Sequence, residues 1–470
     1  MKINIPYLSA YGALPHKRSN KDLDIWPFLD YIFFMETKIT HENWEVLKTF
    51  LPRGWEKEAV NLGALVRKRK IHSPAILLRV LLIHLAGGKS LRTTAAYARE
   101  ANICNVNDVA LLHRLKGSTE WLRWMCVEIY KDLKGTELPS KLLNKYRIRL
   151  VDGSSISEPG STGTDWRIHY CFQLNTLRCD SFKITTPKEG ETLYRYSVSE
   201  NDLMVGDRAY CSRKGIAYTL NHGGQVLIRF HSTNLPLYNR KGKPFPVLDC
   251  LRTLEDNDEG DWDVWFKSPE DKGLIKGRLI SILKSEEAIE KAHKKLRRNA
   301  SKKGHKLKPE TLEHARYVSL FTTVNRHGFK GKNLLSLYRS RWQIELVFKR
   351  LKGIIALGHL PKYNEESSMS WLYGKMLVAL LTERLYQEAE FISPGGTQFE
   401  CPQGDNIIMK QNGVRSPWRE FEFWFMMVQH SIIPVLPINH VLKNWDRIKV
   451  GLMENSRLRR LQIERLVSEN

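Results

Sequence analysis

The stretch YRIRLVDGSS, residues 146–155, marks the point where the pattern of the chain changes. Before it, apolar residues recur with helical spacing; from it onward, short runs rich in β-branched and aromatic residues predict strands. The apolar run of this stretch is followed by Asp152. In a second stretch, LMVGDRAY at 203–210, the apolar run LMVG is followed by Asp207. We therefore predict two strands that each end in a carboxylate.

The neighbouring segments predict a mixed α/β layer. Strand-like runs at 166–175 and 179–187 follow the first strand, which suggests a three-stranded meander. Helix-compatible KEGETLYRYSVSE (188–200) precedes the second aspartate strand, and a helix at 212–224 and the strand QVLIRF (225–230) follow it. Alternating strands and helices after a meander are typical of an α/β fold.

The segments on either side of this layer differ from it. Residues 1–145 read as helical, with Ser73-Pro74 as a helix start and two short helices whose second member contains His113, Arg114 and Lys116. This pair suits a helix-turn-helix, and an ordinary helical bundle suits it equally. Residues 231–324 hold four further strand candidates, including PFPVLDCLRTL (244–254), around the basic run 291–308. That run has nine Lys/Arg and no acid, and it is either a solvated segment or one that follows a nucleic-acid backbone.

The composition favours a polyanionic partner. The 470 residues have a formal net charge of +23, and neutralising phosphates releases counterions. No apolar run reaches the roughly 20 residues of a membrane-spanning helix, and the N-terminus lacks a signal-peptide core. The seven cysteines contain no CxxC pair, and AGGKS (86–90) lacks the first glycine of a P-loop. We expect a cytoplasmic protein with no membrane partner and no nucleotide cofactor.

A second informative stretch is YRSRWQIELVFKRLKG, residues 338–353. As one amphipathic helix it places apolar residues on one side and a polar stripe on the other. The stripe consists of Tyr338, Arg341, Glu345, Lys349 and Lys352. A solvated face with i,i+4 ion pairs explains this stripe if it is taken alone.

Ordinary roles also exist for the two aspartates, since Asp152-Gly can start a turn and Asp207 can pair with Arg208. A phosphodiester-cutting site explains all three acids together. Two hard divalent cations need oxygen ligands, which Asp152, Asp207 and Glu345 would supply. The basic residues of the stripe would then hold DNA phosphates beside the acids.

The spacing Tyr338-x2-Arg341-x3-Glu345-x6-Lys352 resembles the Y-R-E-K signature of the IS4 family of bacterial insertion-sequence transposases, to which the Tn5 transposase belongs. VDGSS and VGDRAY resemble the first and second aspartate motifs of this family. The resemblance covers most of residues 75–390. It implies an RNase H-like catalytic core that is interrupted by a β-rich insertion and flanked by helical N- and C-terminal regions.

Residue by residue, the resemblance implies that Asp152, Asp207 and Glu345 are the catalytic and metal-binding DDE triad. It implies DNA binding by a further set of residues, namely Tyr338, Arg341, Trp342, Lys349, Lys352 and, more weakly, Arg208. Trp342 matches an aromatic that shapes a pocket for a flipped base, although a core tryptophan is the alternative. Trp262 and Trp265 are candidates for a second stacking aromatic.

The resemblance further implies cut-and-paste transposition by two Mg²⁺ ions, for which Mn²⁺ would substitute. The partners would be double-stranded DNA, as terminal inverted repeats and target, and a second copy of the chain in a synaptic homodimer at the bacterial nucleoid. The alternative is an inactive, repressor-like DNA-binding protein. The expected regions are 1–145 (helical, DNA-binding), 146–230 and 325–392 (catalytic core), 231–324 (insertion) and 393–470 (C-terminal, dimerising).

Overall fold

The computed structural model describes residues 42–133, 145–392 except 162, 257, 272, 328, 362 and 363, and 417–433. Parts of the predicted regions 1–145 and 393–470 therefore lie outside the described residues, namely 1–41, 134–144, 393–416 and 434–470.

Eight strands form one mixed sheet in the order β3-β2-β1-β4-β5-β8-β7-β6. Their bounds are β1 Arg147–Ile156, β2 Trp166–Gln173, β3 Arg178–Thr185, β4 Asp202–Gly206, β5 Gln225–Arg229, β6 Glu259–Lys267, β7 Leu274–Leu283 and β8 Tyr317–Thr322. The strands β1, β4 and β5 are parallel, and all other neighbours are antiparallel. The predicted meander and the aspartate-bearing strands are confirmed, and the sheet is consistent with an RNase H-like core.

The register of the central strands sets the position of the two aspartates. Leu150 of β1 lies beside Val205 of β4, and each aspartate follows two residues later. Strand β1 continues to Ile156, so the prediction that this strand ends at Asp152 is wrong, whereas Asp207 directly follows β4. The register nevertheless places the two aspartates beside each other and on the same face.

Side chains that alternate along these strands enter two separate apolar clusters. Leu150 and Val205 belong to a cluster shared with α14 and the N-terminal helices. Val151 and Met204 face the other way, into a cluster shared with α9 and the outer strands. The sheet is therefore buried on both faces, which is why its central strands are almost wholly apolar.

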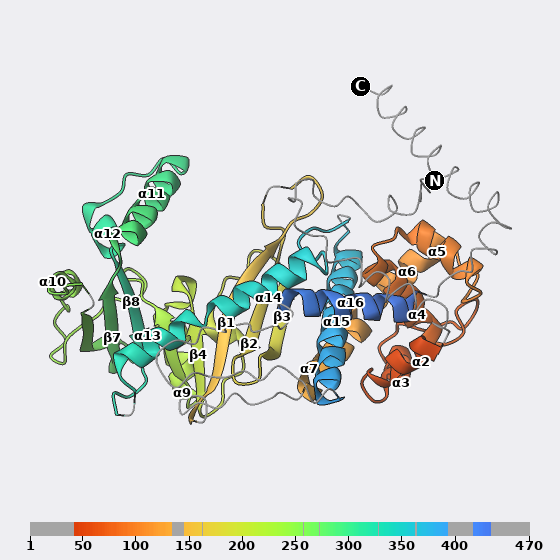
Figure 1. Ribbon diagram of the computed structural model, residues 1–470, viewed down its shortest axis with the longest axis horizontal. Helices are drawn as coiled ribbons and strands as arrows, with labels where there is room; N and C mark the ends of the chain where they lie inside the picture. Colours follow the sequence, from red (N-terminus) through yellow and green to blue (C-terminus); the bar gives the residue numbers. More distant parts are fainter. Residues whose placement is uncertain are drawn as a thin grey trace, which may run out of the picture.

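Helices pack against the sheet, and a further group of helices lies beside one end of it (Figure 1). The helices on the N-terminal side are α2 Glu42–Thr49, α3 Trp55–Asn61, α4 Pro74–Gly87, α5 Leu91–Glu100, α6 Asp108–Lys116 and α7 Thr119–Asp132. The remaining α-helices are α9 Arg213–Asn221, α10 Val247–Arg252, α11 Glu286–Lys302, α12 Pro309–His314, α13 Gly331–Arg339, α14 Trp342–Gly353, α15 Glu365–Ile392 and α16 Pro417–Ile432. In Figure 1, α14 lies across β1, α2–α6 lie at one end of the molecule and α11 lies at the other.

The predicted start of α4 is confirmed in detail. The hydroxyl oxygen of Ser73 accepts a hydrogen bond from the N–H of Ile76, and Pro74 occupies the first turn. Gly88 ends the helix in the left-handed conformation, with φ of 61°. None of the described helices is long and apolar enough to cross a membrane.

Three local predictions are wrong. Residues 188–200 form only the short 3-10 helix η3 Leu193–Arg195, and the strand expected at 244–254 is instead the helix α10. The stretch 338–353 is not one helix, because a turn at Ser340 and Arg341 separates α13 from α14.

The other three strand candidates of 231–324, at 261–268, 277–285 and 317–324, do form, as β6, β7 and β8. They are not a separate layer. Strand β8 pairs antiparallel with β5, and β7 and β6 follow it, so these strands continue the central sheet.

Candidate active site

Asp152 lies inside β1 rather than in a turn, so the turn interpretation of Asp-Gly is wrong. One carboxylate oxygen accepts a hydrogen bond from the N–H of Gly153 at 2.8 Å. The pKa of the Asp152 carboxyl is raised to about 7, mainly by burial and also by the charge of Asp207, although the N–H of Gly153 and the charge of Arg341 act to lower it. This carboxyl is thus in an environment that lacks enough positive charge to balance it.

Asp207 follows β4 and caps η4 Arg208–Tyr210. Its Oδ1 accepts a hydrogen bond from the N–H of Ala209 at 2.8 Å. The ion pair with Arg208 that would explain Asp207 as an ordinary surface residue does not occur among the described contacts. Asp207 instead acts electrostatically on Asp152.

Glu345 lies in the first turn of α14 and reaches the same place from above the sheet. The guanidinium of Arg341 donates a hydrogen bond from Nη2 to Oε1 of Glu345, and its Nη1 lies 3.6 Å from Oδ2 of Asp152. One cation therefore contacts carboxylates from β1 and from α14. The i,i+4 ion pair predicted for Arg341 and Glu345 is present, but it includes a strand carboxylate as well.

A cavity of about 490 Å³ opens beside these acids. Its lining comes from β1 and α14 and consists of Asp152, Gly153, Ser154, Glu345, Phe348, Lys349 and Lys352. Partial burial lowers the pKa of the Lys352 ammonium. Two acids and two lysines thus face one space of the size that ligand sites usually have.

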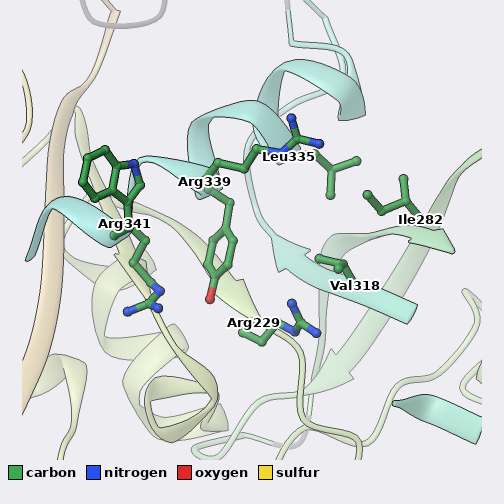
Figure 2. A pocket seen from close by; sticks show the side chains of 8 residues that line it. Arg229, Ile282, Val318, Leu335, Arg339 and Arg341 are labelled. Carbon is green, nitrogen blue, oxygen red and sulfur yellow. The ribbon is translucent and has the colours of Figure 1, made fainter. Parts of the chain in front are cut away.

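A second cavity has a volume of about 300 Å³ and is lined in part by Arg341. Its lining residues are Arg229, Ile282, Val318, Leu335, Tyr338, Arg339, Arg341 and Trp342. Figure 2 shows the apolar side chains of Ile282, Val318 and Leu335 gathered on one side, with Arg339 above and Arg229 below and Arg341 on the opposite side. This cavity combines an apolar wall, aromatic rings and positive charge.

The aromatic residues predicted for base stacking are only partly brought together. Trp342 lines the second cavity and is 46% exposed, so the core interpretation of this residue is wrong. Trp262 and Trp265 lie on β6 and line neither cavity among the described residues. The ring of Trp262 instead covers Gly260, where a Cβ atom would be 1.9 Å from it.

Arg208 is exposed and lines neither cavity, but its charge reaches a residue that no sequence motif indicated. Arg229, at the end of β5, lines the second cavity. The pKa of Arg229 is lowered to about 10, mainly by burial and also by the charges of Arg208 and Arg341. A charged residue at the end of a buried strand was the signal that identified the aspartates, and it would have found Arg229.

Glu191 is a second residue of the site that no sequence motif indicated. Its carboxylate packs against Gly153, where a Cβ atom would lie 2.5 Å from Oε1. Burial raises the pKa of Glu191, and the charge of Asp207 raises it further, whereas Arg167, 3.8 Å away, lowers it. Glycine within a strand often marks such a close approach, so Gly153 was the available signal.

The donor chemistry of the site fits a hard divalent cation, because carboxylate oxygens are the ligands that such ions prefer. Within the part of the chain that the structure describes, no three His, Cys, Asp or Glu side chains converge closely enough to hold a metal. Arg341 supplies positive charge to Asp152 and Glu345 instead.

The comparison with known families assigns this arrangement. Residues 143–381 match the model of the transposase DDE domain, a range that includes all three acids and both cavities. The chain belongs to the DDE transposase family. The transposase domain therefore coincides with the sheet and the helices that surround the two cavities.

Curated relatives agree with this assignment. The transposase is 30% identical over 355 residues to InsL, a putative transposase for insertion sequence element IS186A from Escherichia coli (strain K12), covering 74% of this chain and 95% of the relative. It is 30% identical over 356 residues, with the same coverage, to the transposase for insertion sequence element IS421 of Escherichia coli. A shorter match, 26% over 150 residues and 31% of each chain, relates it to the transposase for insertion sequence element IS1151 of Clostridium perfringens.

These relatives are IS4-family-like transposases, which confirms the family expected from the sequence. The transposase is accordingly a DNA-cutting and strand-transferring enzyme of a family that generally uses divalent metal ions.

Proposed function

We propose that this transposase excises and reinserts an insertion sequence by a cut-and-paste route, with Asp152, Asp207 and Glu345 as its catalytic and metal-binding triad. One observation supports the proposal most strongly. Carboxylates from β1 and α14 share the guanidinium of Arg341 beside a cavity that also contains two lysines. Acids and cations grouped in this way could bind a phosphodiester, because preorganised charges stabilise the negative charge that develops on a reacting phosphate.

The triad would hold two Mg²⁺ ions, with Mn²⁺ as a substitute. When bound, such ions stabilise the attacking and leaving oxygens of an in-line displacement at phosphorus. Asp152 and Asp207 would fix these ions from the sheet, and Glu345 would do so from α14. Lys349 and Lys352 would orient the non-bridging phosphate oxygens, because their ammonium groups face the same cavity.

The second cavity would receive a nucleotide next to the cut. Tyr338 and Arg341 would bind its phosphate, and the exposed indole of Trp342 would stack on its base, since such stacking contributes about 1–3 kcal/mol per base. Arg229 adds a further positive charge to the lining of this cavity. Arg208 would contact the backbone further along the strand.

The remaining assignments are part of the same proposal. The N-terminal helices, with α5 and α6 as a helix-turn-helix, would recognise the terminal inverted repeats. Two copies of the chain would pair two ends, with help from the region 393–470, and capture target DNA at the bacterial nucleoid. The boundaries 1–145, 146–230, 231–324, 325–392 and 393–470 are those of the regions proposed for these roles.

Single changes of Asp152, Asp207 and Glu345 to Ala test the triad. Each variant should retain binding to duplex DNA that contains the element's end, measured by fluorescence anisotropy, and should lose Mg²⁺-dependent cleavage of it. Each should also bind Mn²⁺ more weakly by electron paramagnetic resonance, which separates metal binding from turnover. Substantial cleavage by the Glu345→Ala protein would disprove the assignment.

A further inference from the structure

A strongly charged surface of the described chain lies on α11 and the residues that follow it, at the end of the molecule opposite α2–α6 (Figure 1). We call this surface the basic arm; its cations, all exposed, are Lys291, Lys294, Lys295, Arg297, Arg298, Lys302, Lys303, Lys306 and Lys308. Within the described residues only Lys291 has an acidic partner, Glu287 at 4.0 Å, and both of these side chains are more than 80% exposed. The charge of the basic arm is therefore not neutralised within that part of the chain.

The helix has two distinct sides. Ile289 is 5% exposed, and the ring Nε2 of His293 lies 2.8 Å from the carbonyl oxygen of Leu312 in α12. Lys294, Arg298 and Lys302 follow at i, i+4 and i+8, which places them in one row away from that packed side. Successive cations in this row are about one turn, or about 5.4 Å, apart along the axis.

The basic arm is firmly attached to the sheet. It begins after β7, and the following α12 leads into β8. The ammonium of Lys284 donates a hydrogen bond to the carbonyl oxygen of Ala315, and Glu313 of α12 pairs with Arg252 of α10 at 2.6 Å. Glu313 is thus paired away from the basic arm, and the cations are presented on an anchored element.

These features distinguish between polyanions. A helix that lies on a membrane needs an exposed apolar face, and the apolar side of α11 is packed instead. A duplex backbone needs only a row of long cationic side chains, because phosphate contacts do not depend on base sequence.

We propose that the basic arm is a sequence-independent clamp on the phosphate backbone of duplex DNA, away from the bond that is cut. This proposal rests on DNA being the partner, as in the proposed function, and not on the catalytic triad. The arm would strengthen binding to end DNA and to unrelated DNA alike.

The test uses a variant of the full chain that has Lys294, Lys295, Arg298 and Lys302 changed to Gln. Its affinity for an end duplex and for a random duplex of equal length is measured by anisotropy over a range of NaCl concentrations. Both affinities should fall together, and the slope of log K against log salt should become shallower by about one unit for each phosphate that is no longer neutralised. Because the four side chains are exposed, the melting temperature should not change.

The matched control exchanges Lys and Arg at the same four positions and retains the charge, so its slope should equal that of the unchanged protein. An unchanged slope in the Gln variant, or a loss confined to the end duplex, would overturn the clamp. If the unchanged protein binds anionic vesicles and the Gln variant does not, the basic arm binds a membrane surface and the clamp is refuted. If Asp152→Ala abolishes cleavage while the Gln variant keeps the salt slope of the unchanged protein, the proposed clamp is refuted and the proposed catalytic triad is not.

Discussion

The guanidinium of Arg341 joins Asp152 and Glu345: it donates a hydrogen bond to Glu345 and lies 3.6 Å from a carboxylate oxygen of Asp152. These acids come from a strand and a helix that are far apart in the chain. Arg341 itself belongs to neither helix, because it lies in the turn between α13 and α14. Its position gives the two carboxylates a positive partner from within the protein.

We expect Arg341 to compete with divalent cations for these carboxylates. The Arg341→Gln protein without DNA should bind Mn²⁺ more tightly, by about tenfold, which corresponds to about 1.4 kcal/mol. Electron paramagnetic resonance measures the free ion. Arg339→Gln removes the same charge from an exposed arginine nearby, and an equal gain in that control would show a general charge effect instead.

The double change of Arg341 and Lys352 to Gln separates a phosphate grip from a solvated helix face. Melting temperature should stay within a few degrees, since partly exposed pairs contribute only about 0.2–1 kcal/mol. Cleavage should fall by about 10²–10³-fold, because charge placed beside a reacting phosphate is worth several kcal/mol. Both are measured on one preparation, and normal cleavage would refute the phosphate grip.

Trp342→Ala should leave the protein folded, because the indole is 46% exposed. If Trp342 stacks on a displaced base, nicking of the first strand should continue, and the step that follows should slow. Strand-resolved gels with end-labelled DNA distinguish these steps. A parallel loss of nicking and of folded protein would show that Trp342 is structural.

Asp202 should be important for stability, because it joins the strands that hold the two aspartates. Fully buried at the start of β4, it pairs with Arg147 at 2.5 Å and Arg149 at 3.0 Å. Asp202→Asn should lower the free energy of unfolding by about 1.5–3 kcal/mol, since it removes one of the two carboxylates that pair with buried Arg149, the other being Asp180. Arg147→Gln, at a side chain that is 41% exposed, should cost less than about 1 kcal/mol in the same urea titrations.

The pH dependence of this loss has a definite sign. Burial alone would raise the pKa of Asp202, but hydrogen bonds from Arg147 and Ser199 bring it below its ordinary value. The folded protein then binds fewer protons at this site than the unfolded chain, so the stabilisation is complete above about pH 4. In urea titrations at several pH values, the deficit of the Asp202→Asn variant should stay constant from about pH 5 to 8 and shrink only in stronger acid.

Local patterns were enough to predict the elements that position the triad. The apolar runs that end at Asp152 and Asp207 are strands because buried parallel strands need apolar side chains on both faces. The start of α4 was predictable because Ser73 and Pro74 satisfy the free N–H groups of a first turn.

The errors arise where tertiary contacts override these patterns. The hydroxyl of Ser340 donates a hydrogen bond to the carbonyl oxygen of Leu337 at 2.6 Å, and i→i+3 bonds tighten the chain there, so the amphipathic pattern of 338–353 crosses a break. Residues 188–200 do not form the expected helix, and the side chains of Leu193 and Tyr196 pack into the apolar cluster that also contains Val151 of β1. The residue pattern of a single segment cannot predict a contact with a distant segment. The second cavity could not be predicted for the same reason, because several separate segments form it.

The pairing of β8 with β5 has a consequence for how far the protein reaches along its substrate. One hydrogen-bonded ladder runs from β1, beside the proposed cut, to β8, which follows the basic arm and α12. Those two strands are three spacings apart, about 14 Å, and a sheet does not stretch. The separation between the basic arm and the proposed cut is therefore fixed by the sheet. On the side of the basic arm, the edge of a nuclease footprint should stay the same number of base pairs from the cleaved bond, whatever sequence lies between them.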